Sequence, residues 1–204
     1  MYFKKYRRGN IRSMRIMNKK EIRKIIIKKR KSINPISWKL NSQIICNKIL
    51  NKINLLNKSI GIYFPINNEV ALIELFNLIK SIYLPKIKNN EINFCKHSFD
   101  GKINNFDLLK NPKKYNLIFE NKTFNPKMQK NITIPEIIFI PLVAFNEKCF
   151  RIGYGGGFYD KYLQNKSILK IGVAFEMQKM NFIPDNHDIQ LNYIFTEKRI
   201  YHKH

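Results

Sequence analysis

The residues best suited to chemistry lie in one glycine-rich loop, which runs from Arg151 to Asp160 and reads R-I-G-Y-G-G-G-F-Y-D. It follows an apolar run at 137–145 and precedes a segment that can begin a helix. Because glycine has no Cβ and adopts positive φ at little cost, the backbone here can approach an anion closely. Arg151 can pair with phosphate oxygens, and Asp160 can hold a hard cation that accompanies phosphate. The loop therefore indicates a phosphate site or, alternatively, a turn that packs a strand against a helix.

This loop does not follow the two standard nucleotide-binding patterns. No Gly-Lys-Ser/Thr follows the glycines, as a P-loop requires, and Phe158 stands where G-x-G-x-x-G would have its last glycine. Three aromatic residues, Tyr154, Phe158 and Tyr159, can stack on a flat heterocycle or simply pack. The rest of the chain must decide between these interpretations.

Apolar periodicity predicts the elements that position the loop. Helical spacing predicts a basic amphipathic helix at 18–32, with Ile22, Ile25 and Ile26 on its apolar face. A second helix begins near Pro35, with a stripe of Leu40, Ile44, Ile45, Ile49 and Leu50, and a crossover helix covers 67–79. Strands are predicted at 59–65, 81–85, 91–95, 137–143, 169–175 and 192–196, with a short helix near 106–109 and a strand near 117–119. This alternation predicts an α/β protein with a single three-layer α/β/α domain and a mainly parallel sheet.

Polar residues follow three of the predicted strands. Ligands of open α/β sheets bind beyond the carboxyl ends of the strands, so Glu69, the glycine loop and Asp188 should meet at one edge. Asp160 and Asp188 together could hold magnesium through carboxylate oxygens and waters. Asp188 could also be a turn residue, and Glu69 a first-turn carboxylate that offsets a helix dipole.

Composition restricts the class of protein. With 204 residues and 44% hydrophobic residues, the chain can build one domain with a substantial core and is not disordered. A formal charge of +24 would suit a nucleic-acid partner, but the lysines are spread along the chain with many Ile and Asn residues, and no recognition motif accompanies them. We therefore attribute the charge to compositional drift and do not expect nucleic-acid binding as the main role.

Cysteine, histidine and hydropathy patterns predict a cytoplasmic protein. Cys46, Cys95 and Cys149 form no C-x-x-C pair, and the histidines form no zinc pattern, so a reducing compartment and no structural metal are expected. No apolar run approaches the length of a membrane span. Residues 1–16 are basic and are expected to be a disordered extension or the product of a misassigned start, with a transit peptide as the alternative, while 17–200 form the domain.

The segment 140–163, which reads IPLVAFNEKCFRIGYGGGFYDKYL, closely resembles the signature of the 5-formyltetrahydrofolate cyclo-ligase family. The resemblance continues in order along the chain from about Lys19 to Glu197. It includes the segments 19–23, 63–69, 171–178, 183–188 and 194–197.

The resemblance implies ATP-dependent closure of 5-formyltetrahydrofolate to 5,10-methenyltetrahydrofolate, with magnesium required and ADP and phosphate released. It implies a fold similar to that of sugar-phosphate isomerases and CoA transferases. It further implies that magnesium is bound by Asp160 and Asp188, and that folate contacts Phe64, Glu69 and Tyr154. The ATP-binding residues it implies are Lys19, Arg23, Arg151, Gly153, Gly155, Gly156, Gly157, Phe158 and Tyr159; those with catalytic roles are Glu69, Arg151 and Tyr154.

Two departures from the family pattern are visible. Asn146 replaces an Asp after the Ala-Phe pair, and Glu120-Asn121 stands where the family has Glu-Pro. Two alternatives therefore remain beside a monomeric cyclo-ligase. One is a family member that binds folate or nucleotide without turnover, and the other is a basic nucleic-acid-binding protein.

Overall fold

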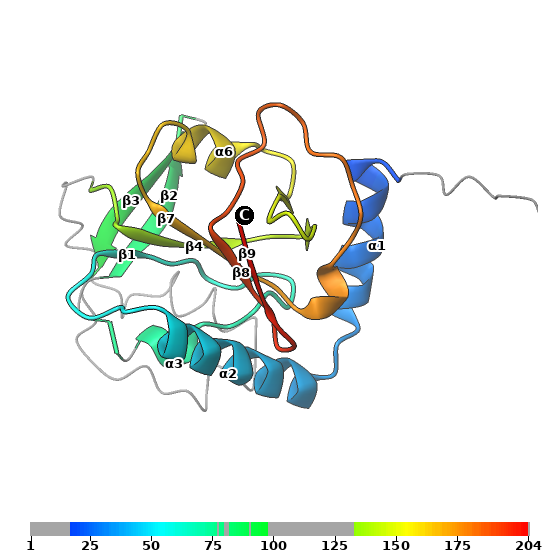
Figure 1. The fold of residues 1–204 in the computed structure, drawn as a ribbon, viewed down its shortest axis with the longest axis horizontal. Helices are drawn as coiled ribbons and strands as arrows, with labels where there is room; N and C mark the ends of the chain where they lie inside the picture. Colours follow the sequence, from blue (N-terminus) through cyan, green and yellow to red (C-terminus); the bar gives the residue numbers. More distant parts are fainter. Residues whose placement is uncertain (1–16, 77, 80–81, 90, 98–132, 204) are drawn as a thin grey trace, which may run out of the picture.

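The structure is a computed structural model that describes residues 17–76, 78–79, 82–89, 91–97 and 133–203. Within these residues, seven strands form one sheet in the order β3-β2-β1-β4-β7-β8-β9 (Figure 1). The central strands run parallel, and only the two edge strands, β3 and β9, pair antiparallel with their neighbours. The strand bounds are β1 Ile60–Gly61, β2 Ile82–Lys88, β3 Glu91–His97, β4 Ile137–Pro141, β7 Leu169–Val173, β8 Tyr193–Phe195 and β9 Ile200–His202.

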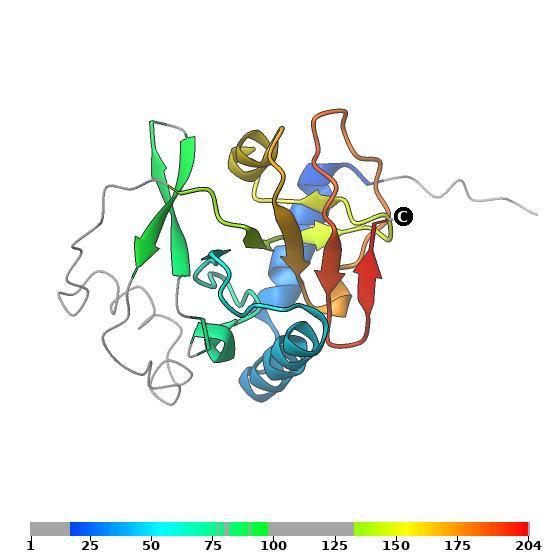
Figure 2. The same ribbon diagram turned by 60° about the vertical axis from the view of Figure 1, so that its left-hand side comes forward.

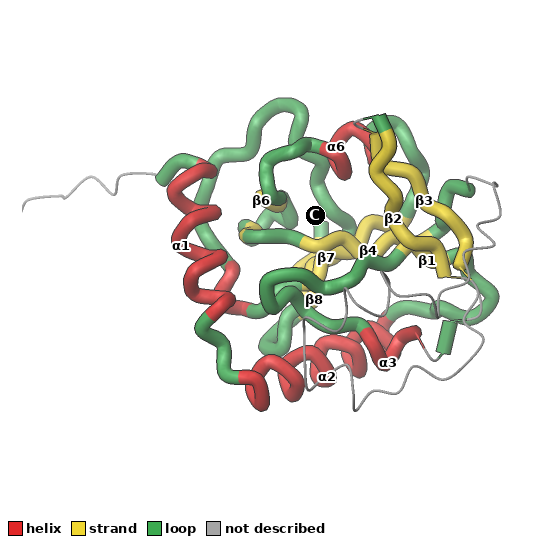
Figure 3. The backbone as a smooth tube through the Cα atoms, turned by 180° about the vertical axis from the view of Figure 1, so that it is seen from behind, coloured by secondary structure: helices red, strands yellow, loops and turns green. Residues whose placement is uncertain are grey.

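Helices cover both faces of this sheet. Helices α2 (Pro35–Lys52) and α3 (Ile73–Phe76) lie on one face and α6 (Phe158–Leu163) on the other, as seen from behind in Figure 3. Helix α1 (Lys19–Lys31) packs on a small antiparallel hairpin of β5 (Ala144–Phe145) and β6 (Arg151–Ile152), and a short 3₁₀ helix, η1, covers Glu176–Gln178. Figure 2 shows the β2–β3 hairpin at one end of the sheet and β9 at the other. The prediction of an α/β fold with a mainly parallel sheet is confirmed.

Strand β4 shows how the sheet separates two cores. Its side chains alternate between faces: Ile137 and Phe139 join the cluster under α2 and α3, whereas Ile138 and Ile140 join the cluster under α6. All four are at most 4% exposed, and burial of each such side chain contributes about 1.5–3 kcal/mol. This explains why a strand with apolar residues at every position lies at the centre of the sheet.

The stripe predicted for α2 is partly wrong. Leu40, Ile44 and Leu50 are 52%, 42% and 37% exposed, while the buried face consists of Trp38, Ser42, Ile45, Cys46 and Ile49. The helix turns this face inward because Trp38 fills the core and the Ser42 hydroxyl accepts the buried amide hydrogen of Ala71 at 3.1 Å. In α1, Ile25 is likewise 36% exposed, although Ile22 and Ile26 are buried as predicted.

The crossover helix predicted at 67–79 is also wrong over most of its length. Asn67 and Asn68 have φ of 49° and 54°, and these left-handed conformations are incompatible with an α-helix. Residues 70–73 are all buried, so this segment has no polar face, and helix appears only at Ile73–Phe76. Three strands, β5, β6 and β9, were not predicted.

Some predictions concern segments outside the described residues, namely the extension at 1–16, the short helix near 106–109, the strand near 117–119 and the Glu120-Asn121 departure. Among the described helices, none has the length and apolarity required to cross a membrane.

Candidate active site

A cavity of about 540 Å³ lies beyond the carboxyl ends of β1, β4 and β7. Its walls come from α1, the segment after β1, the β2–β3 hairpin, the glycine loop with α6, and the segment 185–188 after β7. All the residues predicted for the site line this one cavity: Lys19, Arg23, Phe64, Glu69, Arg151, Gly153, Tyr154, Gly155, Gly156, Gly157, Phe158, Tyr159, Asp160 and Asp188. Convergence at one sheet edge therefore agrees with the geometry expected from parallel strands.

The glycine loop begins at the β5–β6 hairpin and ends where α6 begins. The hairpin brings the chain back, since Ala144 pairs with Ile152 and Phe145 with Arg151. Within the loop, Gly155 has φ of 112° and Gly157 has φ of 66°, which other residues rarely adopt. Both glycines are exposed, so the loop backbone is available to a ligand.

Arg151 and Asp160 lie at the two ends of this loop and pair with each other. The Arg151 Nη2 atom lies 3.1 Å from Oδ1 of Asp160, and the two side chains are only 4% and 15% exposed. The Asp160 carboxylate also accepts the amide hydrogen of Ile189 at 3.3 Å. Nε of Arg151 is buried without a hydrogen-bond acceptor in the described part of the chain, and Nη2, also buried, has the ion pair with Asp160 but makes no hydrogen bond. An anion in the cavity can supply the missing acceptors.

Helix α1 contributes two cations from its first turns. A capping box begins the helix, in which Asn18 Oδ1 accepts from the Glu21 amide at 2.9 Å and Glu21 accepts from the Asn18 amide at 3.1 Å. Four residues apart, Lys19 and Arg23 then face the cavity. Arg23 donates from Nε to the Gly153 carbonyl at 2.8 Å, which joins α1 to the glycine loop.

Lys19 lies between two carboxylates that the segment after β7 supplies. Its ammonium pairs with Oδ2 of Asp185 at 2.7 Å and also with Oδ2 of Asp188. The hydrogen bond and the charge of Lys19 lower the pKa of Asp185. Asp188 is held further by the Asp185 amide, which donates to its Oδ2 at 2.8 Å. Lys19 therefore stands where a cation would bind to these carboxylates.

The described residues offer more candidate metal ligands than the predicted pair of Asp160 and Asp188. Asp188 groups with Asp185 and His187, and their ligand atoms lie within 4.8 Å of one another. Asp160 contacts the amide of Ile189, next along the chain to Asp188. In the described residues, Asp160 Oδ2 and Asp188 Oδ1 make no hydrogen bond, so each carboxylate keeps an oxygen for a hard cation. The carboxylates therefore suit magnesium, with Asp185 as a further candidate that the sequence did not single out.

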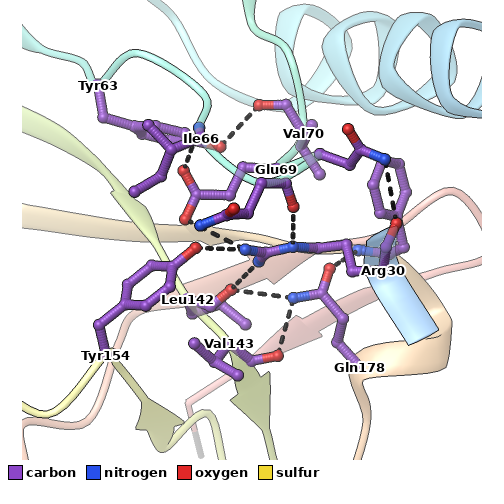
Figure 4. A network of polar contacts seen from close by, with 12 residues as sticks. Arg30, Tyr63, Ile66, Glu69, Val70, Leu142, Val143, Tyr154 and Gln178 are labelled. Atoms are coloured by element: carbon purple, nitrogen blue, oxygen red, sulfur yellow. Dashed lines mark hydrogen bonds and ion pairs between the residues drawn. The ribbon is translucent and has the colours of Figure 1, made fainter. Parts of the chain in front are cut away.

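Glu69 also lines the cavity. Its side chain is 3% exposed, and Oε2 accepts the Ile66 amide hydrogen at 3.0 Å (Figure 4). The left-handed Asn67 and Asn68 form this turn, which Asn tolerates better than most residues. The Trp38 indole donates to the Glu69 carbonyl at 2.8 Å and fixes the backbone. Since α3 begins four residues later, Glu69 does not offset a helix dipole.

Burial dominates the electrostatics of Glu69. It raises the pKa of Glu69 to about 7, although the Ile66 amide and the positive charge of Arg30 act in the opposite direction. The Oε1 atom is buried without a hydrogen bond in the described chain, and the nearest cation is Nη2 of Arg30 at 3.7 Å. A carboxylate of this kind can take up or release a proton near neutral pH.

Phe64 and Tyr154 complete the wall beside Glu69. The Phe64 ring packs against Phe76 at a centroid distance of 5.6 Å, and Tyr154 is 42% exposed. The hydroxyl of Tyr154 accepts a hydrogen bond from Arg30. Arg30 is a polar residue of this region that was not predicted from the sequence. Its spacing after Ile22 and Ile26, at intervals of four, could have placed it on the buried face of α1.

The Asn146 departure has a local role in this structure. Asn146 is 7% exposed, its Oδ1 accepts the Phe150 amide at 3.0 Å, and its Nδ2 donates to the Phe182 carbonyl at 3.4 Å. The side chain amide thus stabilises the turn between β5 and β6, at some distance along the chain from the glycines.

A mainly parallel sheet with a charged cavity beyond its carboxyl ends defines an α/β protein with a ligand-binding site. The model of the 5-formyltetrahydrofolate cyclo-ligase family matches residues 15–197, and the chain belongs to that family. The predictions of the family and of an enzyme of the ligase class are therefore confirmed.

Individual members of the family are similar in sequence to most of this chain. The chain is 30% identical over 192 residues to the 5-formyltetrahydrofolate cyclo-ligase of Mycoplasma pneumoniae, covering 89% of this chain and 100% of that protein. It is 32% identical over 186 residues to the 5-formyltetrahydrofolate cyclo-ligase of Haemophilus influenzae, covering 85% of this chain and 94% of that protein.

Solved structures of 5,10-methenyltetrahydrofolate synthetases are similar to this fold. The 5,10-methenyltetrahydrofolate synthetase from Mycoplasma pneumoniae matches with a TM-score of 0.66 and 28% identity, covering 89% of this chain and 99% of that one. The 5,10-methenyltetrahydrofolate synthetase from Aquifex aeolicus matches with a TM-score of 0.66 and 25% identity, covering 91% of this chain and 93% of that one.

Proposed function

We propose that this chain converts 5-formyltetrahydrofolate to 5,10-methenyltetrahydrofolate with ATP as co-substrate, releasing ADP and phosphate, in the cavity described above. Family membership supports the reaction, and the family implies ATP as co-substrate. The observation that carries the location is the charge arrangement: buried Arg151 nitrogens without acceptors and the buried Glu69 carboxylate line one cavity.

The chemistry requires the formyl oxygen on N5 to become a leaving group. Transfer of a phosphoryl group from ATP to that oxygen achieves this, after which N10 attacks the formyl carbon. The C–O bond then breaks, phosphate departs, and the N10 proton passes to a base. For such a reaction the protein mainly positions the reactants and stabilises developing charge.

The nucleotide side of the cavity is assigned to the glycine loop and three cations. Arg151 offers its unsatisfied guanidinium nitrogens to phosphate oxygens, and Lys19 and Arg23 add charge from α1. The backbone from Gly153 to Tyr159, including Gly155, Gly156, Gly157 and Phe158, lines the same wall. Positive φ at Gly155 and Gly157 supports close approach of phosphate to the main chain.

Asp160 and Asp188 are proposed to hold magnesium. Each keeps one carboxylate oxygen without a hydrogen bond in the described structure, and hard cations prefer such oxygens. When bound, magnesium neutralises charge on the transferring phosphoryl group. Asp185 lies near enough to Asp188 to serve as an additional ligand, whereas the His187 imidazole in the same cluster would better suit a transition metal.

The folate side is assigned to Phe64, Glu69 and Tyr154. Phe64 offers an aromatic surface for the pterin ring, and Tyr154, which is 42% exposed, offers a hydroxyl. With its pKa raised to about 7 by burial, Glu69 is suited to accept the N10 proton. The three cysteines are buried and free, as expected in a reducing compartment, and we further propose that the protein is a cytoplasmic monomer.

Absorbance of methenyltetrahydrofolate provides the test. Purified protein with 5-formyltetrahydrofolate, ATP and magnesium should produce the absorbance, and omission of ATP should abolish it. Tight binding of folate without any ATP-dependent product would overturn the proposal in favour of a binding protein without turnover. Salt-sensitive binding to RNA or DNA in the absence of product would instead favour the nucleic-acid alternative.

A further inference from the structure

Arg30 is an arginine at the basic end of α1 whose side chain is nevertheless 0% exposed. Its neighbours Lys28, Lys29 and Lys31 do not share this burial. Burial of a guanidinium is unfavourable unless its donors and its charge are all compensated. A buried arginine at this position therefore requires an explanation from its partners.

The partners of Arg30 come from three separate segments of the site (Figure 4). Nε donates to the Asn67 carbonyl at 2.7 Å, in the turn that carries Glu69. Nη1 donates to the Leu142 carbonyl at 3.1 Å, just after β4. Nη2 donates to the Tyr154 hydroxyl in the glycine loop and lies 3.7 Å from Oε1 of Glu69. One side chain thus connects the folate wall of the cavity with the loop assigned to ATP.

The contact with Tyr154 decides the direction of its hydroxyl hydrogen. A guanidinium only donates hydrogen bonds, so the Tyr154 oxygen must accept from Arg30. The hydrogen of Tyr154 is then available to an acceptor on another side, either the Glu69 carboxylate or a ligand in the cavity. Without Arg30, the phenol could rotate and accept or donate in either direction.

The contact with Glu69 compensates a buried negative charge. The titratable groups that face Glu69 are Arg30 from α1, Tyr63 from the segment after β1, Tyr154 from the glycine loop and Tyr159 from α6. Burial raises the pKa of each of the three tyrosines, so they stay neutral. Among these groups, Arg30 alone carries a charge that favours the ionised carboxylate.

We propose that Arg30 is a positioning residue for the cyclisation, which keeps Glu69 ionised and directs the Tyr154 hydroxyl, so that both groups present their polar atoms to the folate. This inference rests on the proposed function. Arg30 does not line the cavity itself and acts through Glu69 and Tyr154. Its removal should therefore affect catalysis on the folate side more than ATP binding.

Three variants separate charge from hydrogen bonding. Arg30→Met removes both, Arg30→Lys keeps the positive charge beside Glu69 but loses the forked contacts, and Lys28→Met removes a charge from the exposed face of the same helix. The Glu69 carboxylate is followed by ¹³C NMR in glutamate-labelled protein, and its signal is assigned by its loss in Glu69→Gln.

In Arg30→Met, the midpoint of the Glu69 titration should rise by about one pH unit or more, and the acidic limb of the kcat/KM profile for folate should move with it. Arg30→Lys should keep the Glu69 midpoint near that of the unmodified protein while kcat falls by at least about tenfold. KM for ATP should change little in either variant, and Lys28→Met should leave every quantity unchanged. Equal Glu69 midpoints in all proteins would overturn the proposal, as would equal increases in KM for ATP and folate.

Urea unfolding checks whether Arg30→Met folds. The same measurement on the double variant Arg30→Met/Glu69→Gln supplies a second test of the proposal. If Arg30 compensates the buried carboxylate, the double variant should be more stable than Arg30→Met alone at a pH above the Glu69 midpoint of Arg30→Met, where Glu69 is ionised. Equal stabilities at that pH, or a less stable double variant, would contradict the proposal. Absence of product with the unmodified protein would refute the proposed function, whereas the NMR and urea experiments would still decide whether Arg30 controls Glu69.

Discussion

The guanidinium of Arg151 and the carboxylate of Asp160 lie 3.1 Å apart, so the first and last residues of the glycine loop contact each other. Asp160 is also held by the Ile189 amide, which ties this pair to the segment that carries Asp185 and Asp188. The proposed phosphate ligand and the proposed metal ligand are therefore coupled. Substitutions of these two residues should not be additive, because each leaves the other without its partner.

Arg151→Ala should raise KM for ATP by about 10- to 100-fold, with a much smaller effect on KM for folate. The physical reason is the loss of charge-assisted hydrogen bonds to phosphate oxygens. Steady-state kinetics with each substrate varied in turn measures both constants. Arg151→Lys is the control, since it retains the charge but not the bidentate geometry. Its KM for ATP should lie between those of the unmodified protein and Arg151→Ala. A larger effect on folate than on ATP would remove Arg151 from the phosphate site.

Asp160→Asn should lower kcat by about 100-fold or more and weaken the dependence of the rate on magnesium, because an amide oxygen is a poorer ligand for a hard cation. Asp185→Asn is the matched comparison, since Asp185 belongs to the other candidate cluster and its side chain is 55% exposed. Measurement of the rate as a function of magnesium concentration distinguishes Asp160→Asn from Asp185→Asn. A normal rate in Asp160→Asn together with a strong defect in Asp185→Asn would assign the metal to Asp185, His187 and Asp188.

Lys19→Met should tighten Mn²⁺ binding in the absence of nucleotide and weaken ATP binding. The ammonium of Lys19 lies between Asp185 and Asp188 and competes with a cation for their oxygens. Electron paramagnetic resonance of free Mn²⁺ measures the first effect, and equilibrium dialysis of ATP the second. Lys20→Met, on the exposed side of the same turn, is the control and should change neither. Unaltered Mn²⁺ affinity in Lys19→Met would show that Lys19 does not compete with the metal.

Glu69 should make the free energy of unfolding fall as pH rises from about 4.5 to about 7. Burial raises the pKa of Glu69 from 4.5 to about 7, so the folded state binds this proton more tightly than the unfolded chain does. The contribution is complete below the unfolded pKa and is lost as pH rises through the folded pKa. The expected loss is on the order of 3 kcal/mol, from about 1.4 kcal/mol per pH unit.

The measurement compares urea unfolding of the unmodified protein and Glu69→Gln across this pH range. The difference between the two stabilities should decline with rising pH and then level off above about pH 7. Glu136→Gln serves as a control with no slope in this range. The hydrogen bond with Lys58 and those with Ser59 lower the pKa of Glu136 from 4.5 to about 2, so its contribution to stability changes only below about pH 4.5. A constant difference between the unmodified protein and Glu69→Gln would show that Glu69 is not desolvated.

The sequence alone was sufficient to determine the sheet class and the edge at which the site lies. Apolar runs such as Ile137–Pro141 predict strands from local sequence alone. Crossover connections make these strands parallel, so that their carboxyl ends lie at the same edge of the sheet. Glu69, the glycine loop and Asp188 could therefore be assigned to one place. The spacing of Ile22, Ile26 and Arg30 also carried the information that Arg30 is on the buried face, although its residue type pointed to solvent.

The tertiary structure decided the contacts that give these residues their properties. Lys19 meets Asp185 and Asp188 more than 160 residues along the chain, and Arg30 meets Glu69, Leu142 and Tyr154 from three segments. Sequence period and propensity depend on near neighbours, and they do not specify which distant groups pack together. Desolvation and pairing, which set the charge of Glu69 and the free donors of Arg151, depend on that packing and therefore arise only in the folded chain.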